Sequence, residues 1–208
     1  MMWEFSKYTF GEEVANSITH GVGTLLGVLM FVLFFRNYPV TFANVFCFSV
    51  YGVSLIVLYL VSAIYHALKV NGAKMVFRKL DHCSIFLLIA GTYTPISVLL
   101  IRGKLGVIVL SCIWSLAILG IVLNSISVEK FAKFSFFCYL GMGWAAVTIL
   151  QPLIRNLTKH QLFCFFSGGI AYTVGAVIYL LGKKVRYMHS VWHLFVLTGS
   201  TAHVLIFF

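Results

Sequence analysis

Seven long apolar segments dominate this sequence and leave it few ways to fold. They cover about residues 14–35, 42–68, 81–101, 105–125, 133–151, 160–182 and 187–208. Each reaches the ~20 residues that a helix needs to cross the hydrocarbon of a bilayer. Lipid offers the backbone no hydrogen-bond partners, so each segment must satisfy its own peptide groups as a helix. We therefore expect an all-α, integral membrane bundle of seven transmembrane helices that forms one domain over residues 1–208.

The composition agrees with a membrane protein. Of the 208 residues, 61% are hydrophobic and only 10% are charged, and a soluble domain of this length cannot bury so much apolar surface. The net charge of +10 would suit a nucleic-acid partner, but the basic residues fall in short loops between apolar segments, as membrane topology requires. The first apolar segment is too long for the core of a signal peptide, so we expect it to remain as a helix.

The basic residues are unequally divided between the two ends of the expected bundle. Those on the N-terminal side are Lys7, Lys69, Lys74, Arg78, Lys79, Lys130, Lys133, Lys183, Lys184 and Arg186. Those on the opposite side are Arg36, Arg102, Lys104, Arg155 and Lys159. The positive-inside rule then places the N-terminus in the cytoplasm and the C-terminus outside. This orientation is opposite to that of ordinary seven-helix G-protein-coupled receptors.

Polar residues inside the apolar segments point to a functional site, because such groups are costly in a membrane. His189 and His193 are four residues apart in the last segment, so they share a helical face. His66 ends the second segment, with Ser62 four residues before it, and Asp81 begins the third. At ~1.5 Å of rise per residue, His66 and His193 both lie within about ten ångströms of the cytoplasmic boundary. The five residues can therefore meet at one depth.

Three imidazoles and one open position are the ligand pattern of catalytic zinc. Zn²⁺ lowers the pKa of its bound water toward ~7, and a nearby carboxylate can hold that water and take its proton. Asp81, the only aspartate in the chain, is the candidate for this role, and Ser62 would polarise a substrate carbonyl or orient Asp81. The alternatives are that the histidines reach lipid headgroups and that Asp81 caps the third helix.

A second polar stripe lies on the first segment, where Glu13, Asn16 and His20 follow a spacing of i, i+3 and i+7. This spacing places all three on one face of a helix. They would form hydrogen-bonded contacts with neighbouring helices, support the metal ligands from behind, or act as a gate over the metal. We favour support, since asparagine is an unusual ligand for zinc.

Taken together, the motifs resemble those of the hemolysin III family, bacterial members of the adiponectin and progestin receptor superfamily, over nearly the whole chain. They are E-x2-N-x3-H on Glu13, Asn16 and His20, S-x3-H with a following Asp on Ser62, His66 and Asp81, and H-x3-H on His189 and His193. The resemblance implies seven helices with a cytoplasmic N-terminus in a bacterial cytoplasmic membrane. It also implies zinc on His66, His189 and His193, with Asp81 near the bound water.

Three functions remain open at this point. The superfamily includes ceramidase-like enzymes, so the resemblance implies a zinc-dependent hydrolase of lipid amide or ester bonds that takes its substrate from the cytoplasmic leaflet. The alternatives are a cytolytic or pore-forming hemolysin, and a lipid sensor without enzymatic activity that regulates the state of the membrane. In each case we expect membrane lipids as partners and no nucleic acid, while the substrate and the oligomeric state are not specified by the sequence.

Overall fold

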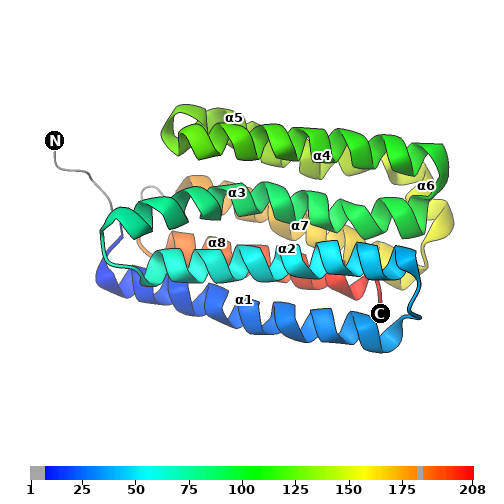
Figure 1. Cartoon of the computed structure of the whole chain (residues 1–208), viewed down its shortest axis with the longest axis horizontal. Helices are drawn as coiled ribbons and strands as arrows, with labels where there is room; N and C mark the ends of the chain where they lie inside the picture. Colours follow the sequence, from blue (N-terminus) through cyan, green and yellow to red (C-terminus); the bar gives the residue numbers. More distant parts are fainter. Residues whose placement is uncertain (1–7, 182–184) are drawn as a thin grey trace.

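The computed structural model describes residues 8–181 and 185–208. Within these ranges all regular secondary structure is helical (Figure 1). The α-helices are α1 (Phe10–Asn37), α2 (Phe42–Ala67), α3 (Gly72–Pro95), α4 (Gly103–Ile126), α5 (Val128–Trp144), α6 (Leu150–Asn156), α7 (Lys159–Leu181) and α8 (Met188–Leu205). A π-helix, η1 (Ile96–Ile101), continues α3, and a 3-10 helix, η2 (Ala145–Ile149), joins α5 to α6.

Six of these helical rods are long and apolar enough to cross a membrane, judged over the described residues. They are α1, α2, α3 continued by η1, α4, α5 continued through α6, and α7. The shorter helix α8 completes the bundle at the C-terminal end. The expected class, an all-α multi-pass membrane protein built on seven helices, is therefore confirmed. The orientation remains a prediction, and Lys7, Lys183 and Lys184, which contribute to it, lie outside the described residues, as does position 182 at the end of the sixth expected segment.

The first and last helices of the chain lie side by side. Most helices pack against their neighbours in sequence, as α1 does on α2 and α7 on α8, but α8 also packs against α1. Figure 1 shows α8 returning behind α2 and close to α1. This contact brings the start of the sequence to the H-x3-H motif near its end, a pairing that no local pattern specifies.

Two glycines allow α1 to approach α2 closely near the expected site. A Cβ atom at Gly23 would lie 2.6 Å from the ring of Tyr59, and one at Gly27 would lie 3.4 Å from the side chain of Ile56. A small residue at both positions lets the two helix backbones come together. The polar face of α1 is thereby held against α2, one turn from Gly23.

The third and fifth helical segments differ most from their expected bounds. The third helix begins at Gly72 rather than at residue 81, with the side chain of Asn71 accepting a hydrogen bond from the Lys74 amide at 3.0 Å. Asp81 therefore lies about two and a half turns inside α3, and the prediction that it begins or caps the helix is wrong. Hydropathy marks the apolar part of a helix, and basic residues in the first turns of α3 hid its start. The fifth segment, expected over 133–151, likewise extends from Val128 to Asn156.

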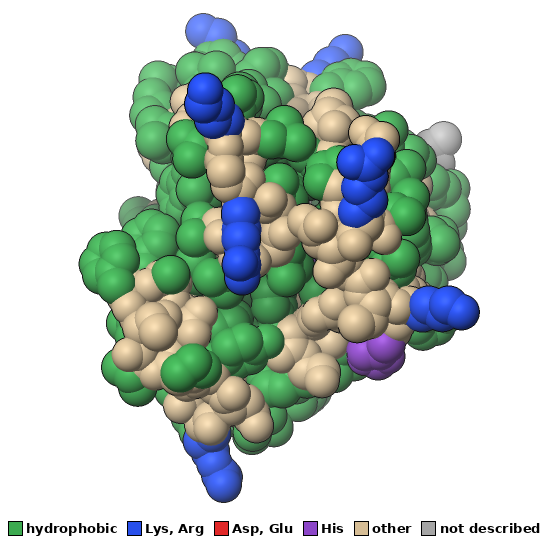
Figure 2. All heavy atoms as spheres, turned by 90° about the vertical axis from the view of Figure 1, so that its right-hand side faces the viewer, with side chains coloured by type: hydrophobic (Ala, Val, Ile, Leu, Met, Phe, Trp, Pro, Cys, Tyr) green, Lys and Arg blue, Asp and Glu red, His purple; other side chains and the backbone are tan. Residues whose placement is uncertain are grey.

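The two ends of the bundle differ in charge. The end formed by the α1–α2, η1–α4 and α6–α7 connections shows basic side chains among hydrophobic ones and no acidic side chain (Figure 2). The described acidic residues lie toward the other end and are Glu12, Glu13, Asp81 and Glu129. Acidic groups and the histidines of the expected site are thus gathered at one end.

Candidate metal centre

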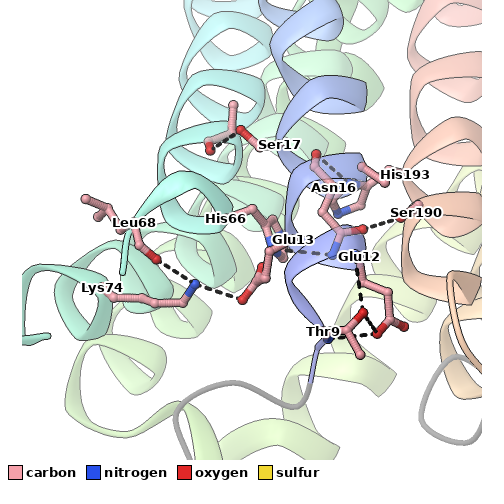
Figure 3. A network of polar contacts seen from close by, with 12 residues as sticks. Thr9, Glu12, Glu13, Asn16, Ser17, His66, Leu68, Lys74, Ser190 and His193 are labelled. Atoms are coloured by element: carbon pink, nitrogen blue, oxygen red, sulfur yellow. Dashed lines mark hydrogen bonds and ion pairs between the residues drawn. The ribbon is translucent and has the colours of Figure 1, made fainter. Parts of the chain in front are cut away.

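Two helices bring the expected metal ligands to one end of the bundle, and a third supports them. His66 lies at the end of α2, and His189 and His193 lie in the first turns of α8. The start of α1 contacts both helices and carries Glu13 and Asn16 toward these rings (Figure 3). We call this end of the bundle, formed by the start of α1, the end of α2 and the start of α8, the histidine end.

The three histidines form a compact group. One ring nitrogen from each of His66, His189 and His193 lies within 4.8 Å of the other two. The ring centroids are 5.2 Å apart between His66 and each of the other two, and 4.6 Å apart between His189 and His193. Such a group can hold a metal ion, and it is the one such group found among the described residues.

Glu13 and Lys74 fix the ring of His66. One carboxylate oxygen of Glu13 lies 2.6 Å from Nδ1 of His66, and the other accepts a hydrogen bond from Nζ of Lys74 at 2.8 Å. Lys74 also donates to the carbonyl of Leu68 at 3.0 Å and is only 3% exposed (Figure 3). Because the carboxylate accepts, the ring proton sits on Nδ1, and Nε2 is left for a metal.

His193 is held in the same way by a different set of acceptors. Its Nδ1 lies 3.1 Å from the hydroxyl of Thr19 and 3.3 Å from the backbone carbonyl of Asn16. The carbonyl can only accept, so Nδ1 carries the proton here too. In the part of the chain that the structure describes, Nε2 of His66 and Nε2 of His193 are buried without a hydrogen-bond partner. Such atoms cost about 1–3 kcal/mol each, and a bound cation would remove that cost.

His20 and Asn16 contact the ligands from the side of α1. The ring of His20 stacks on that of His193, with centroids 3.5 Å apart and planes 14° apart. Oδ1 of Asn16 accepts a hydrogen bond from the Ser190 hydroxyl at 2.5 Å. The amide nitrogen of Asn16 lies 3.5 Å from Nδ1 of His66, a packing contact only, because that ring nitrogen already donates to Glu13. These contacts would suit the support that we expect of the polar stripe, a role that remains a prediction.

Ser62 and Asp81 lie outside the group of three ligands. Ser62 is buried one turn before His66, and its hydroxyl has no hydrogen-bond partner among the described residues. Asp81 is half-buried on α3, and its backbone carbonyl accepts a hydrogen bond from Ser84. The catalytic roles expected of these two residues remain predictions.

Tyr8 covers the centre and was not identified from the sequence. Its ring lies 4.8 Å from that of His189 and 5.9 Å from that of His66, measured between centroids. The pKa of Tyr8, which precedes α1, is raised above its usual range by burial first, and then by the nearby groups of Tyr65, Tyr179, Glu13 and Asp81. Tyr8 therefore lies against two of the three candidate ligands.

Lys74, Thr19 and Ser190 were also missed as parts of the site. Lys74 was counted only as a loop charge, and the two hydroxyl residues adjoin His20 and His189 without any spacing that singles them out. Their roles depend on contacts between helices, which the sequence pattern of one helix does not contain.

Comparison with known proteins gives consistent matches over nearly the whole chain. The family model described as Haemolysin-III related matches residues 8–204. Hemolysin-3 of Bacillus cereus is 44% identical over 91% of this chain and 87% of its own length. The hemolysin-3 homolog of Bacillus subtilis (strain 168) is 39% identical over 94% and 92%, respectively. The human monocyte to macrophage differentiation factor is 27% identical over 95% of this chain and 83% of its own length.

Proposed function

The chain belongs to the haemolysin-III-related family, and we propose that it is a zinc-dependent hydrolase of amide or ester bonds in membrane lipids. One observation carries the proposal. Two buried Nε2 atoms from different helices have no partner in the described structure, and each belongs to a ring whose Nδ1 is already held. With His189 they supply three neutral nitrogen ligands, the donor set of catalytic zinc in which one position stays open.

Each residue of the site would have a defined task. When bound, zinc supplies a Lewis acid and a water of lowered pKa. Glu13 fixes the tautomer of His66, and the Asn16 carbonyl does the same for His193. The carboxylate of Asp81 would accept a proton, and the hydroxyl of Ser62 would donate a hydrogen bond to the carbonyl oxygen of the lipid.

The proposed location is the cytoplasmic membrane of a bacterium, with the histidine end facing the cytoplasm. The excess of basic residues on this side supports that orientation. A lipid substrate would then come from the cytoplasmic leaflet. Fusing a reporter enzyme that is active only in the cytoplasm to either terminus tests the orientation, and activity at the C-terminus would contradict it.

The names of the two bacterial relatives, hemolysin-3 and hemolysin-3 homolog, favour cytolysis as a second candidate function. The three-histidine group is not needed for a water-filled pore, so direct lysis should not depend on it. Leakage from dye-loaded vesicles, measured with wild type and with a variant that lacks the histidines, separates the two functions. Equal leakage would favour the cytolysin.

The first experiment is a metal analysis of detergent-purified protein by elemental mass spectrometry. Wild type should contain about one zinc per chain, and the His189→Ala, His193→Ala double variant should contain almost none. His203→Ala, at the other end of α8, serves as the control and should keep its zinc. Absence of zinc from wild type would refute the proposal.

Zinc-loaded wild type would next be assayed with ceramide-like and phospholipid substrates. Hydrolysis that is lost in the double variant and kept in His203→Ala would support the enzyme. Zinc at one per chain without turnover of any of these lipids would leave a lipid sensor with a structural metal.

A further inference from the structure

A hollow of about 480 Å³ opens beside the metal centre, between the start of α1 and the end of α2. Its inner wall includes Glu13 and His66, the acid and the ligand that form one edge of the centre. In Figure 3, Leu68, Lys74 and Ser17 lie on the α2 side of these two residues, away from His193 and Ser190. The α1–α2 hollow therefore reaches the centre beside His66, and the ring of Tyr8, which also lines the hollow, separates it from His189.

The outer wall of the α1–α2 hollow is apolar and faces outward. Phe10 is 86% exposed, Val14 is 40% exposed and Ile18 is 61% exposed, and they follow one another along α1. At ~1.5 Å per residue, these three positions extend over about 12 Å. In a membrane, such a ridge is surrounded by lipid tails, so the hollow can admit an acyl chain directly from the bilayer.

The rim of the α1–α2 hollow is positively charged. Lys74, in its lining, is already paired with Glu13, so these two charges cancel. Lys69 is exposed at the rim, and no ion pair or hydrogen bond of its ammonium group is found within residues 8–181 and 185–208. A single uncompensated ammonium beside an apolar wall is complementary to an anionic headgroup attached to a hydrocarbon chain. A neutral lipid would leave Lys69 unpaired.

We infer that the α1–α2 hollow is the lateral docking site of an anionic, phosphate-bearing membrane lipid. The phosphate meets Lys69, the acyl chain lies along Phe10, Val14 and Ile18, and the bonds near the headgroup come to lie against His66. The hollow has the size of a small-ligand pocket, enough for a headgroup and its first carbons. The inference deepens the proposed function, since it rests on that function for the hydrolysis of this lipid but not for its docking.

Native mass spectrometry of the purified protein tests the docking. The protein is titrated with phosphatidylglycerol and, separately, with a neutral diacylglycerol that carries the same acyl chains. Wild type should bind one phosphatidylglycerol about tenfold more tightly, the difference that one charge-assisted hydrogen bond makes. Equal affinity for the two lipids would overturn the inference.

Two pairs of variants separate this site from a general attraction to headgroups. Lys69→Gln should remove the preference for phosphatidylglycerol, while Lys130→Gln, an exposed lysine at the start of α5, should keep it. Ile18→Trp should fill the hollow and weaken binding about tenfold, while Leu25→Trp, two turns further along the same face of α1, should not. If either control behaves like its partner, the lipid does not dock in the hollow.

Two further measurements distinguish a lipid from a soluble phosphate, and docking from hydrolysis. Glycerol 3-phosphate at millimolar concentration should not displace the lipid, and full displacement together with normal binding by Ile18→Trp would assign the hollow to a soluble phosphate instead. Zinc content is measured on every sample. Docking without hydrolysis by zinc-loaded protein would refute the proposed function and leave the inference, whereas hydrolysis without selective docking would do the reverse.

Discussion

His193 and His203 lie on the same helix and both turn a ring toward other helices, yet their surroundings differ. At His193, Nδ1 is held by α1, the buried Nε2 has no partner among the described residues, and the ring lies beside those of His66 and His189. At His203, Nε2 lies 3.1 Å from the backbone carbonyl of Phe165 and the ring packs between Phe165 and Tyr172. His203 is therefore tied to α7 as a packing element. Convergence of free nitrogens, rather than burial of a histidine, distinguishes a candidate metal centre.

The largest expected difference between the two regions is in metal content. His193→Ala should reduce zinc from about one per chain to almost none, since it removes one of three ligands, while His203→Ala should keep it. At free zinc about 1,000-fold above the dissociation constant, the bound ion contributes about 4 kcal/mol to the free energy of unfolding. Thermal unfolding with and without a chelator measures this contribution. A chelator effect of equal size in wild type and His193→Ala would contradict the assignment of His193 as a metal ligand.

Asp81→Asn should separate metal binding from catalysis. The substitution removes a carboxylate that lies outside the ligand group, so zinc should remain while lipid hydrolysis falls about 10²–10⁴-fold, as expected for a general base. Glu129→Gln is the matched control, since Glu129 is an exposed acid at the same end that pairs with Arg78. Turnover at the wild-type rate in Asp81→Asn would remove Asp81 as the base.

Glu13→Gln tests whether the acceptor at Nδ1 of His66 strengthens metal binding. His203 has no such carboxylate partner. Loss of the carboxylate from a ligand histidine typically weakens metal binding about 10–100-fold. Glu12→Gln is the control, because Glu12 caps α1 through Thr9 and bonds the Tyr187 amide without touching His66. Zinc affinity is measured by competition with a fluorescent chelator. The role of Glu13 is contradicted if both variants bind zinc equally well.

Gly168→Ala should have the smallest effect of these variants. It should lower the stability of the packing around His203 and leave the metal centre unchanged. A Cβ atom there would collide with the ring of His203, and overpacking of this kind costs about 1–3 kcal/mol. Zinc content should stay unchanged while the midpoint of thermal unfolding falls. Loss of zinc in this variant would show that the two ends of α8 are coupled and would undo the comparison.

The parts of this protein that were predictable from sequence are those fixed by local pattern. Segment length and hydropathy sufficed for the helices, and the spacing of His189 and His193 sufficed to place them on one face. The start of α3 was missed because basic residues in its first turns resemble a loop. Two features of the site were missed: the link from Lys74 through Glu13 to His66, and the packing of Tyr8 on the histidines. Both depend on contacts between separate segments, which the residue spacing within one helix does not indicate.

The adjacency of α1 and α8 has a consequence for the order in which the protein is made. His193 bonds the carbonyl of Asn16 across a separation of 177 residues. At a synthesis rate of ~5–20 residues per second, Asn16 is made about 9 to 35 s before His193. The polar face of α1 must be tolerated by lipid or by the insertion machinery during that interval. The contacts between His193 and α1 can form only after the last helix has been made.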